Sequence, residues 1–221
     1  MTFAAAKSFL VSGGMSSTAA RAEEQARQEN LAVAQGLKRQ EAGLLDELIV
    51  KYQHRLMRYL LYLTGNREQA QDLFQDVWIR IMTRGGQFNG QARFETWLFT
   101  IARNMVIDLR RKRTTSSLDE LFEAGSDDDR PMSFELADDE PTPFDRVSNF
   151  EDRERIAAAL LGIDTLHREV LVLRFYEELS LEEIAKVTKS NLSTVKSRLY
   201  RGMAMIRPRI ERAGLRLREA V

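Results

Sequence analysis

The chain has 221 residues, of which 43% are hydrophobic and 30% are charged, a balance typical of a folded globular protein. It has no cysteine and only two histidines, His54 and His167, in separate helical segments, which excludes disulfides and thiolate sites and argues against a histidine metal site. No apolar run approaches the roughly 20 residues of a membrane span, and the stretch 3–11 is too short for a secretory signal. We therefore expect a cytoplasmic protein that needs no membrane, metal or cofactor.

The formal net charge of zero is an average over unlike segments. Taken alone, neutrality argues against a nucleic-acid partner, but residues 114–150 contain 2 basic and 11 acidic residues, and mildly basic segments flank them. The chain is accordingly predicted to have four parts: an N-terminal extension (1–40), a first domain (41–113), an acidic linker (114–150) and a second domain (151–221).

The N-terminal extension is helix-prone from Ala19 to Gln40 and receives no role. The first domain then shows three amphipathic helical patterns, over residues 44–63, 67–81 and 94–109. Asn66 is the expected N-cap of the second helix. A glycine-rich loop precedes the third helix, which ends in the basic run 110–113.

Residues 114–150 contain three of the four prolines together with the acidic excess, and such sequence buries too little apolar surface to order itself. No segment shows a convincing strand pattern. The predicted fold is therefore all-α, with two small helical domains joined by a flexible acidic linker.

The second domain is predicted to begin with a helix over residues 151–161 and to continue with a helix capped by Thr165. Ser180 and Glu183 match a capping box that opens a third helix. This short helix, a turn at 188–191 and a longer helix from Leu192 to about Arg207 form a predicted helix-turn-helix.

The second helix of this motif has two contrasting faces at 100° per residue. Leu192, Val195, Leu199, Met203 and Ile206 share the inward face. The outward face holds Ser193, Ser197, Tyr200, Arg201 and Ala204, with Thr194 and Lys196 on its flanks. No acidic residue occurs from 192 to 210, whereas an ordinary solvated face mixes both charge signs. Hydroxyl, cationic and aromatic groups in this pattern indicate docking in the major groove of DNA.

These residues resemble a known family. The segments 167–185 (HREVLVLRFYEELSLEEIA) and 193–201 (STVKSRLYR) are similar to region 4 of bacterial extracytoplasmic-function (ECF) sigma factors. The segments 72–78 (DLFQDVW) and 94–104 (FETWLFTIARN), with Asp108, Arg110 and Arg111, resemble region 2 of the same family. The resemblance implies a protein that binds the clamp and flap of core RNA polymerase and directs it to promoter DNA.

The resemblance also assigns residues to promoter contacts. The residues expected at the duplex −35 element are Ser193, Thr194, Lys196, Ser197, Arg198, Tyr200 and Arg201. The residues expected at the melted −10 element are Phe88, Asn89, Trp97, Arg103, Asn104, Arg110 and Arg111. In the family, the loop that here holds Phe88 and Asn89 captures an unstacked base, which stacking and edge hydrogen bonds would stabilise. Trp97 either wedges at the edge of the melted DNA or is a core residue, and core is favoured.

On the second helix of region 2, Asp72, Gln75, Asp76 and Ile79 form an acidic face with one apolar residue, which suits the polymerase clamp and repels DNA. The alternative is an ordinary solvated face.

Two departures from the family pattern stand out. Lys189 and Ser190 occupy the region 4 turn where the family usually has a glycine and an apolar residue, so Lys189 must adopt a left-handed backbone or the turn must differ.

The clamp helix reads Gln69-Ala-Gln-Asp72 where an Asp-Ala-Glu-Asp segment is common, so two negative charges are missing. We hypothesise that phosphorylation near this helix, with Thr64 the first candidate, restores charge and switches on polymerase binding. Alternatively, Gln75, Asp76 and Ile79 suffice without a switch.

A Ser/Thr kinase and an anti-sigma factor are thus the two candidate regulators, and the linker is a candidate occupant of polymerase channels. The alternative function is a helix-turn-helix regulator with an N-terminal sensing domain. An enzyme has little support, since the chain lacks a nucleotide-binding glycine motif, a metal cluster and a nucleophile–base pair.

Overall fold

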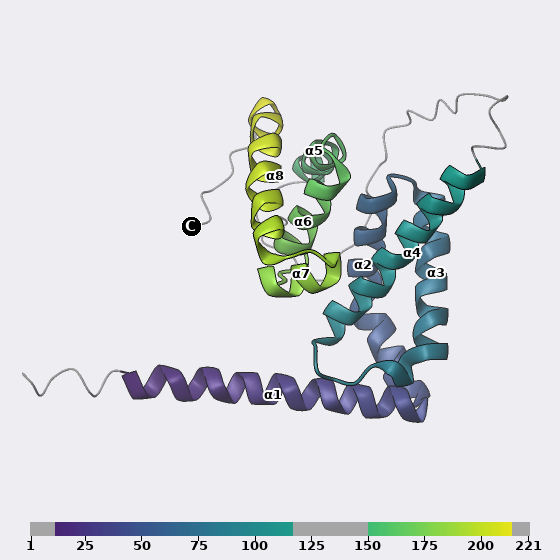
Figure 1. Ribbon diagram of the computed structural model, residues 1–221, viewed down its shortest axis with the longest axis vertical. Coiled ribbons are helices and arrows are strands. Elements are labelled where there is room, and N and C mark those ends of the chain that lie inside the picture. The colour runs from purple at the N-terminus through teal and green to yellow at the C-terminus, as the bar shows by residue number, and fades with distance from the viewer. Residues whose placement is uncertain (1–11, 117–149, 214–221) are drawn as a thin grey trace, which may run out of the picture.

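The computed structural model describes residues 12–116 and 150–213 (Figure 1). The N-terminal helices are α1 (Ser12–Arg39), α2 (Ala42–Thr64), α3 (Arg67–Arg84), the short 3-10 helix η1 (Gly85–Gln87) and α4 (Phe94–Ser116). The C-terminal helices are α5 (Phe150–Leu161), α6 (Thr165–Phe175), α7 (Leu181–Thr188) and α8 (Leu192–Arg212). No strand occurs in these two described ranges, and the all-α prediction is confirmed. The stretch 3–11 and the linker beyond residue 116 lie outside the described residues.

The boundary between α2 and α3 follows from two adjacent residues. Gly65 ends α2 in the left-handed region (φ 66°), and its N–H donates to the Leu61 carbonyl at 2.9 Å. Asn66 then begins α3, because its side chain accepts a hydrogen bond from the Gln69 N–H at 2.9 Å. The predicted cap at Asn66 is confirmed.

The start of α6 differs from the prediction by one residue. Asp164, and not Thr165, is the N-cap, and its carboxylate accepts from the Leu166 N–H at 2.9 Å. Slight burial acts to raise the pKa of Asp164, but the hydrogen bonds from Leu166 and His167 outweigh it and hold this pKa below its ordinary value. Thr165 is the first helical residue. The sequence offers two adjacent capping residues, and the geometry favours the acidic one, whose charge suits a helix N-terminus.

Each group of helices has its own apolar centre. In the N-terminal helices, α2, α3 and α4 pack around Leu56, Tyr59, Ile81, Leu98 and Phe99, all of which are fully buried. The C-terminal helices enclose a second set of buried residues, Leu160, Leu173, Leu179, Ile184 and Ile210. Each of the helices α2 to α8 contributes at least one of these side chains, as expected of amphipathic helices that bury one face.

The two groups also pack against each other. Helix α6 lies beside α2, and α7 lies beside α4, with the loop after α6 held between them (Figure 1). We call this packing the closed arrangement. The sequence predicts two domains but not their contact.

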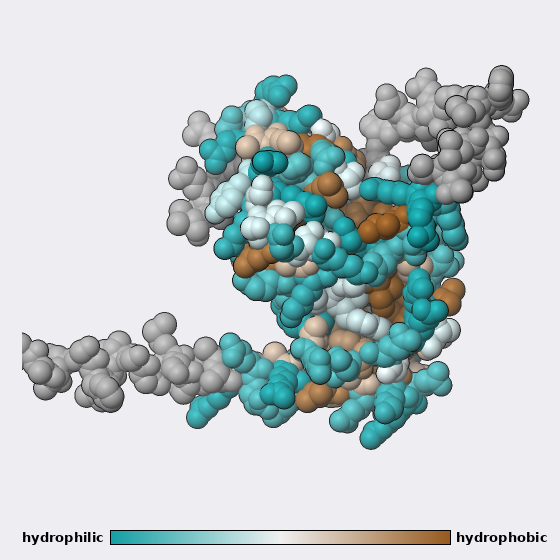
Figure 2. All heavy atoms as spheres, in the orientation of Figure 1, coloured by the Kyte–Doolittle hydropathy of each residue, from teal (hydrophilic) through white to brown (hydrophobic). Residues whose placement is uncertain are grey.

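Helix α1 lies across the foot of the N-terminal bundle. Its C-terminal part packs on η1 and α2, while its N-terminal part extends away from the rest of the molecule (Figure 1). The face shown in Figure 2 is mostly hydrophilic with scattered apolar patches. Among the described helices, none has the length and apolar character needed to cross a membrane.

Candidate nucleic-acid interface

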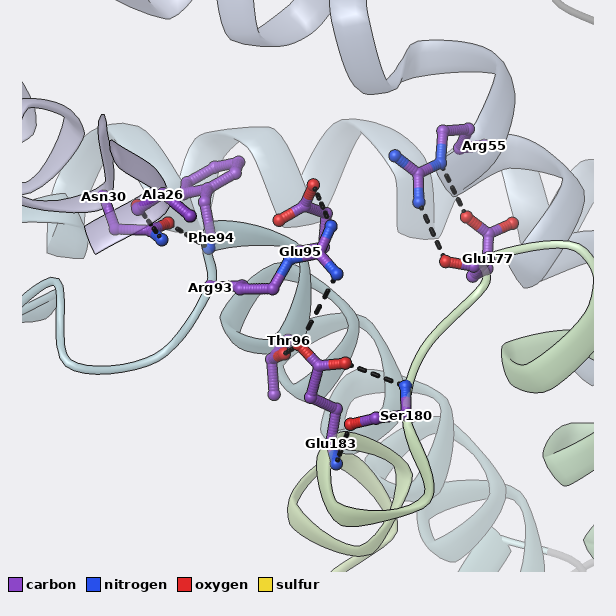
Figure 3. A network of polar contacts seen from close by, with 10 residues as sticks. All are labelled: Ala26, Asn30, Arg55, Arg93, Phe94, Glu95, Thr96, Glu177, Ser180 and Glu183. Carbon is purple, nitrogen blue, oxygen red and sulfur yellow. Dashed lines mark hydrogen bonds and ion pairs between the residues drawn. The ribbon is translucent and has the colours of Figure 1, made fainter. Parts of the chain in front are cut away.

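The helix-turn-helix begins with the predicted capping box. The Ser180 Oγ accepts from the Glu183 N–H at 3.2 Å, and the Glu183 carboxylate accepts from the Ser180 N–H at 2.8 Å (Figure 3). Both bonds satisfy backbone donors that a helix N-terminus otherwise leaves free. The prediction for this helix start is confirmed.

The turn of the motif adopts the strained form that the sequence required. Lys189 has φ 50° and ψ 41°, in the left-handed region, which costs a residue with a side chain about 1 kcal/mol. The Ser190 N–H donates to the Ala185 carbonyl at 3.0 Å and closes the turn. The Ser190 hydroxyl in turn accepts from Arg198 at 3.0 Å, so Arg198 is tied to the turn and is half-buried. The unusual turn sequence is accommodated without a change of motif.

Helix α8 presents the predicted −35 residues to solvent. Val195 and Ile206 are buried on its inner face. Ser193, Lys196, Ser197 and Arg201 are exposed, Thr194 is half-buried, and Tyr200 is 74% exposed. The outward face is therefore polar, cationic and accessible, and a phosphate backbone can approach it without displacing protein.

Asn191 fixes the start of this helix, and with it the first two −35 residues. Its carboxamide oxygen accepts from the Thr194 N–H at 2.7 Å and from the Ser193 hydroxyl at 2.8 Å. We expect Asn191→Ala to lower the free energy of unfolding by about 1 kcal/mol, because the cap is lost. Thermal unfolding followed by circular dichroism measures this, with Ser193→Ala, which keeps the cap, as the control. An unchanged melting temperature in Asn191→Ala would show that the cap contributes nothing.

The predicted −10 residues lie on α4 and in the loop before it, and they differ in accessibility. Asn89 is exposed, and its side chain accepts from the Gln91 N–H at 3.0 Å. Arg110 and Arg111 are exposed, and Asn104 is half-buried. Arg110 also donates to the Leu63 carbonyl, while Arg111 lies 3.4 Å from Asp108. These four residues are accessible to solvent, and two of them are cationic.

Phe88 lies in the predicted loop before α4, but its ring is not exposed. Its ring is only 4% exposed and packs against Trp97 (centroids 5.1 Å apart) and Phe94 (5.7 Å). As a base-stacking surface, Phe88 is therefore unavailable in the closed arrangement, because three apolar rings bury more area together than a solvent-facing one. Trp97 is half-buried in the same cluster, as the favoured core alternative requires.

Arg103 is held by a residue from the C-terminal helices. Its Nε donates to the Glu169 carboxylate at 2.7 Å, and the Tyr59 hydroxyl donates to the same carboxylate oxygen at 3.0 Å. Burial, followed by the Glu169 charge and hydrogen bond, raises the pKa of Tyr59 well above its ordinary value, so the phenol stays a donor. In this arrangement the Arg103 guanidinium binds a carboxylate and not DNA.

A second carboxylate joins the two groups of helices at Glu177. The side chain of Glu177 is 0% exposed and lies 2.8 Å from Arg55 Nε (Figure 3). It also lies 3.1 Å from an Arg58 nitrogen. Arg55 also donates to the Glu177 carbonyl at 3.2 Å. The attraction between the buried carboxylate and the two guanidiniums offsets the cost of removing these charges from water. Removal of any one of the three groups therefore leaves a buried charge with a partner missing, which is costly.

A third set of contacts links α7 to the start of α4. Arg93 lies 3.1 Å from Glu95 and 3.7 Å from Glu183, and the Thr96 hydroxyl donates to Glu183 at 3.4 Å (Figure 3). Burial acts to raise the pKa of Glu95, but hydrogen bonds from its backbone N–H and from Tyr52, with the Arg93 charge, hold it below its ordinary value. Glu95 is thus the anionic partner that fixes Arg93 beside the capping box.

The sequence analysis did not identify the residues that make these three contacts, which are Arg55, Arg58, Glu169 and Glu177. It identified Glu183 only as part of the capping box and not as a partner of α4. One signal was present. Glu169 precedes buried Val172 and Leu173 by three and four residues, so a carboxylate falls on the apolar face of a helix. A carboxylate on an apolar helix face needs a charged or hydrogen-bonding partner, although the sequence does not identify that partner.

The predicted polymerase face is where the pattern put it. Asp72, Gln75, Asp76 and Ile79 are all exposed on α3, and Ile79 has 55% exposure. Met82, one turn further along, is equally exposed and extends the apolar part of this face. Thr64 is half-buried, and its hydroxyl donates to the Leu60 carbonyl at 2.9 Å and accepts from the Asn66 N–H at 3.3 Å.

Comparisons with known proteins agree with the order of these surfaces. The profile of the family Sigma-70 region 2 matches residues 48–115, and that of Sigma-70 region 4 matches residues 153–206. The ECF RNA polymerase sigma factor SigL of Mycobacterium tuberculosis is 33% identical over 79% of this chain and 93% of its own length. SigW of Bacillus subtilis is 28% identical over 79% of this chain and 92% of its own length.

Solved structures share the fold at lower identity. The sigma factor RpoE of Bartonella quintana, in complex with the anti-sigma factor NepR, superimposes with a TM-score of 0.59 at 21% identity, over 75% of this chain and 96% of that one. CnrH, in complex with the cytosolic domain of CnrY, gives a TM-score of 0.57 at 21% identity, over 83% and 97% of the two chains.

Region 2 matches the segment that the alternative prediction treated as a sensing domain, so that alternative is wrong. The order of the two regions and the identity to SigL over most of both chains lead to one assignment. The chain belongs to the ECF RNA polymerase sigma factors, which direct the polymerase to promoters and start transcription.

Proposed function

We propose that this sigma factor divides promoter recognition between two surfaces and binds polymerase through a third. The outward face of α8 reads the −35 duplex. The strip of Asn89, Asn104, Arg110 and Arg111, joined by Arg103 once it is released, holds the −10 strand. The α3 face binds the polymerase clamp, and the chain itself carries out no chemical step.

The observation that carries the −35 assignment is the open, acid-free face of α8. Lys196 and Arg201 supply cations for phosphates or guanine edges, and Ser197 and Tyr200 supply hydroxyls. All four are exposed in the closed arrangement, so duplex reading needs no rearrangement.

The −10 assignment requires a rearrangement. Arg103 is paired with Glu169, and Thr96 is paired with Glu183. We propose that the closed arrangement is the resting form and that opening it exposes the strand-holding surface. Until the two groups of helices separate, carboxylates of the C-terminal helices thus bind the side chains that would otherwise contact DNA phosphates.

The proposed polymerase contact combines three polar side chains with an apolar pair. Asp72, Gln75 and Asp76 suit a basic surface, and exposed Ile79 and Met82 supply apolar area at its edge. Such a patch, rimmed by polar residues, is typical of a protein-binding site and not of a nucleic-acid site. The proposed function places the activity of the protein in the cytoplasm, in complex with the polymerase. Because RpoE of Bartonella quintana was solved in complex with the anti-sigma factor NepR, an anti-sigma factor is a candidate regulator here too.

A reconstituted system tests the proposed function. The full chain and core RNA polymerase are incubated with a pool of duplexes randomised over two blocks, and transcripts are sequenced. We expect transcripts from a narrow set of sequences at a fixed distance downstream, absent without the chain. Transcription no greater than that of core polymerase alone would contradict the proposal.

The proposed switch at Thr64 has its own test. A phosphate there would replace hydrogen bonds to Leu60 and Asn66 and would put close to two negative charges beside the α3 N-terminus. We expect Thr64→Glu to bind core polymerase several-fold more tightly than the unmodified chain in a fluorescence titration. Thr83→Glu adds the same charge at the exposed C-terminal end of α3 and is the matched control. Equal affinity of Thr64→Glu and the unmodified chain would exclude the switch.

A further inference from the structure

Helix α1 donates a cap to a helix that begins 64 residues later. The Asn30 carboxamide oxygen accepts from the Phe94 N–H, the first backbone donor of α4, at 2.9 Å (Figure 3). Its amide nitrogen donates to the Ala26 carbonyl at 2.7 Å, which fixes the side-chain orientation. A helix N-terminus is ordinarily capped by the residue just before it, so this cap ties α1 to the α4 start through tertiary contact.

The loop before α4, residues 85–93, is pressed against the same part of α1. Gly90 has φ +72°, and a Cβ there would lie 3.0 Å from the Asn30 carbonyl oxygen and 3.1 Å from the Leu31 Cα. Both the backbone angle and the close approach therefore require glycine. At the other end of the loop, a Cβ on Gly85 would lie 3.2 Å from the Leu37 Cβ.

The loop is thus packed between two surfaces. Ala34 and Leu37 of α1 are buried beneath it, and the Phe88 ring anchors it from within against Phe94 and Trp97. Asn89, the exposed residue between these anchors, is held in place by neighbours on both sides. Two residues that precede Asn30 use their side chains only within α1: Gln25 bonds to Glu29, and Gln28 bonds to Glu24.

We infer that the C-terminal part of α1, with Asn30 as its main residue, is a positioning element for the −10-binding loop. The inference rests on the proposed role of that loop in holding the −10 strand. Asn30 does not touch the nucleic acid; its side chain holds the start of α4 and its backbone lies close to Gly90, and so α1 fixes where Asn89 and Arg93 lie. The N-terminal extension, which the sequence left without a role, thereby becomes part of the strand-binding site.

The variant that tests this is Asn30→Ala in the full chain, assembled with core polymerase. Hydrogen exchange of the peptide spanning residues 85–95 measures the anchoring. Fluorescence anisotropy measures binding of a labelled single-stranded oligonucleotide that carries the −10 sequence selected in the randomised-pool experiment. We expect faster exchange and about fivefold weaker strand binding, the factor that corresponds to loss of one helix cap. Core binding and binding of a −35 duplex should stay unchanged.

Two further variants make the result specific. Asn30→Asp keeps an acceptor for the Phe94 N–H and adds a charge favoured at a helix N-terminus, but it loses the amide donor to the Ala26 carbonyl. Its exchange and strand binding should therefore lie between those of Asn30→Ala and the unmodified chain. Gln28→Ala, on the exposed part of the same helix, should behave as the unmodified chain.

Asn89→Ala separates the inference from the proposed function beneath it. If Asn89→Ala weakens strand binding and Asn30→Ala does not, α1 is no positioning element. The same holds if exchange over residues 85–95 is unaltered in Asn30→Ala. If neither variant affects strand binding, the proposed role of the loop is wrong, and the inference falls with it.

Discussion

Replacement of Glu177 by glutamine is expected to open the closed arrangement. The substitution keeps the shape but removes the one negative charge between Arg55 and Arg58, which are buried or half-buried and would be left facing a neutral amide. Breaking a buried ion pair in this way costs about 3 kcal/mol, whereas separation of the two helix groups returns both guanidiniums to water. The ratio of open to closed forms should therefore rise by about 100-fold.

The measurement uses the absence of cysteine from the chain. Single cysteines introduced at exposed Glu47 on α2 and Glu211 on α8 carry a donor and an acceptor dye, and energy transfer between them reports separation. We expect lower transfer in Glu177→Gln, and tighter binding of the −10 strand because less free energy is spent on opening. Glu178→Gln makes the same charge change at an exposed neighbouring residue and should leave transfer unaltered. High transfer in Glu177→Gln would mean that the apolar contacts alone keep the two groups together.

The second large effect is expected on α8, where the double substitution Lys196→Ala, Arg201→Ala removes both cations from the outward face. Removal of an arginine that reads a base weakens duplex binding about 10- to 100-fold, and removal of a lysine at a phosphate weakens binding to all sequences alike. The slope of log affinity against log salt should also fall by about one for each phosphate that the protein no longer neutralises. Titration of a labelled −35 duplex at several salt concentrations measures both quantities.

Arg212→Ala is the matched control for the double variant, since it removes a cation from the same helix in its last turn, where the side chain donates to the Pro208 carbonyl. We expect it to keep sequence preference. If the double variant retains both affinity and preference for the selected −35 sequence, a different surface reads the duplex.

Local patterns predicted the local structure well, for reasons that single residues illustrate. The capping box at Ser180, the cap at Asn66 and the left-handed backbone at Lys189 depend on neighbours within four residues, so the sequence contains all that determines them. The inward face of α8 follows from its helical period in the same way.

Contacts between distant segments were beyond such reasoning. Asn30 caps a helix 64 residues away, and Glu177 pairs with arginines more than 100 residues earlier. Neither pairing has a period or a motif, and each depends on how whole helices meet. Phe88 shows the same limit, since its surface position was inferred from a family role, while its burial is decided by Phe94 and Trp97.

The two proposed DNA-binding surfaces of the protein differ in their accessibility to DNA, and this difference has a consequence for the kinetics of promoter binding. In the closed arrangement the α8 face is open, whereas Arg103 is bound by Glu169. If the proposed roles hold, the protein therefore binds duplex DNA first and the −10 strand second. Duplex contacts form at rates set by diffusion and charge, and non-specific sites are scanned and left without any strand separation. The slow, costly step is then reserved for sites that have already retained the protein, so incorrect sites are rejected before melting begins.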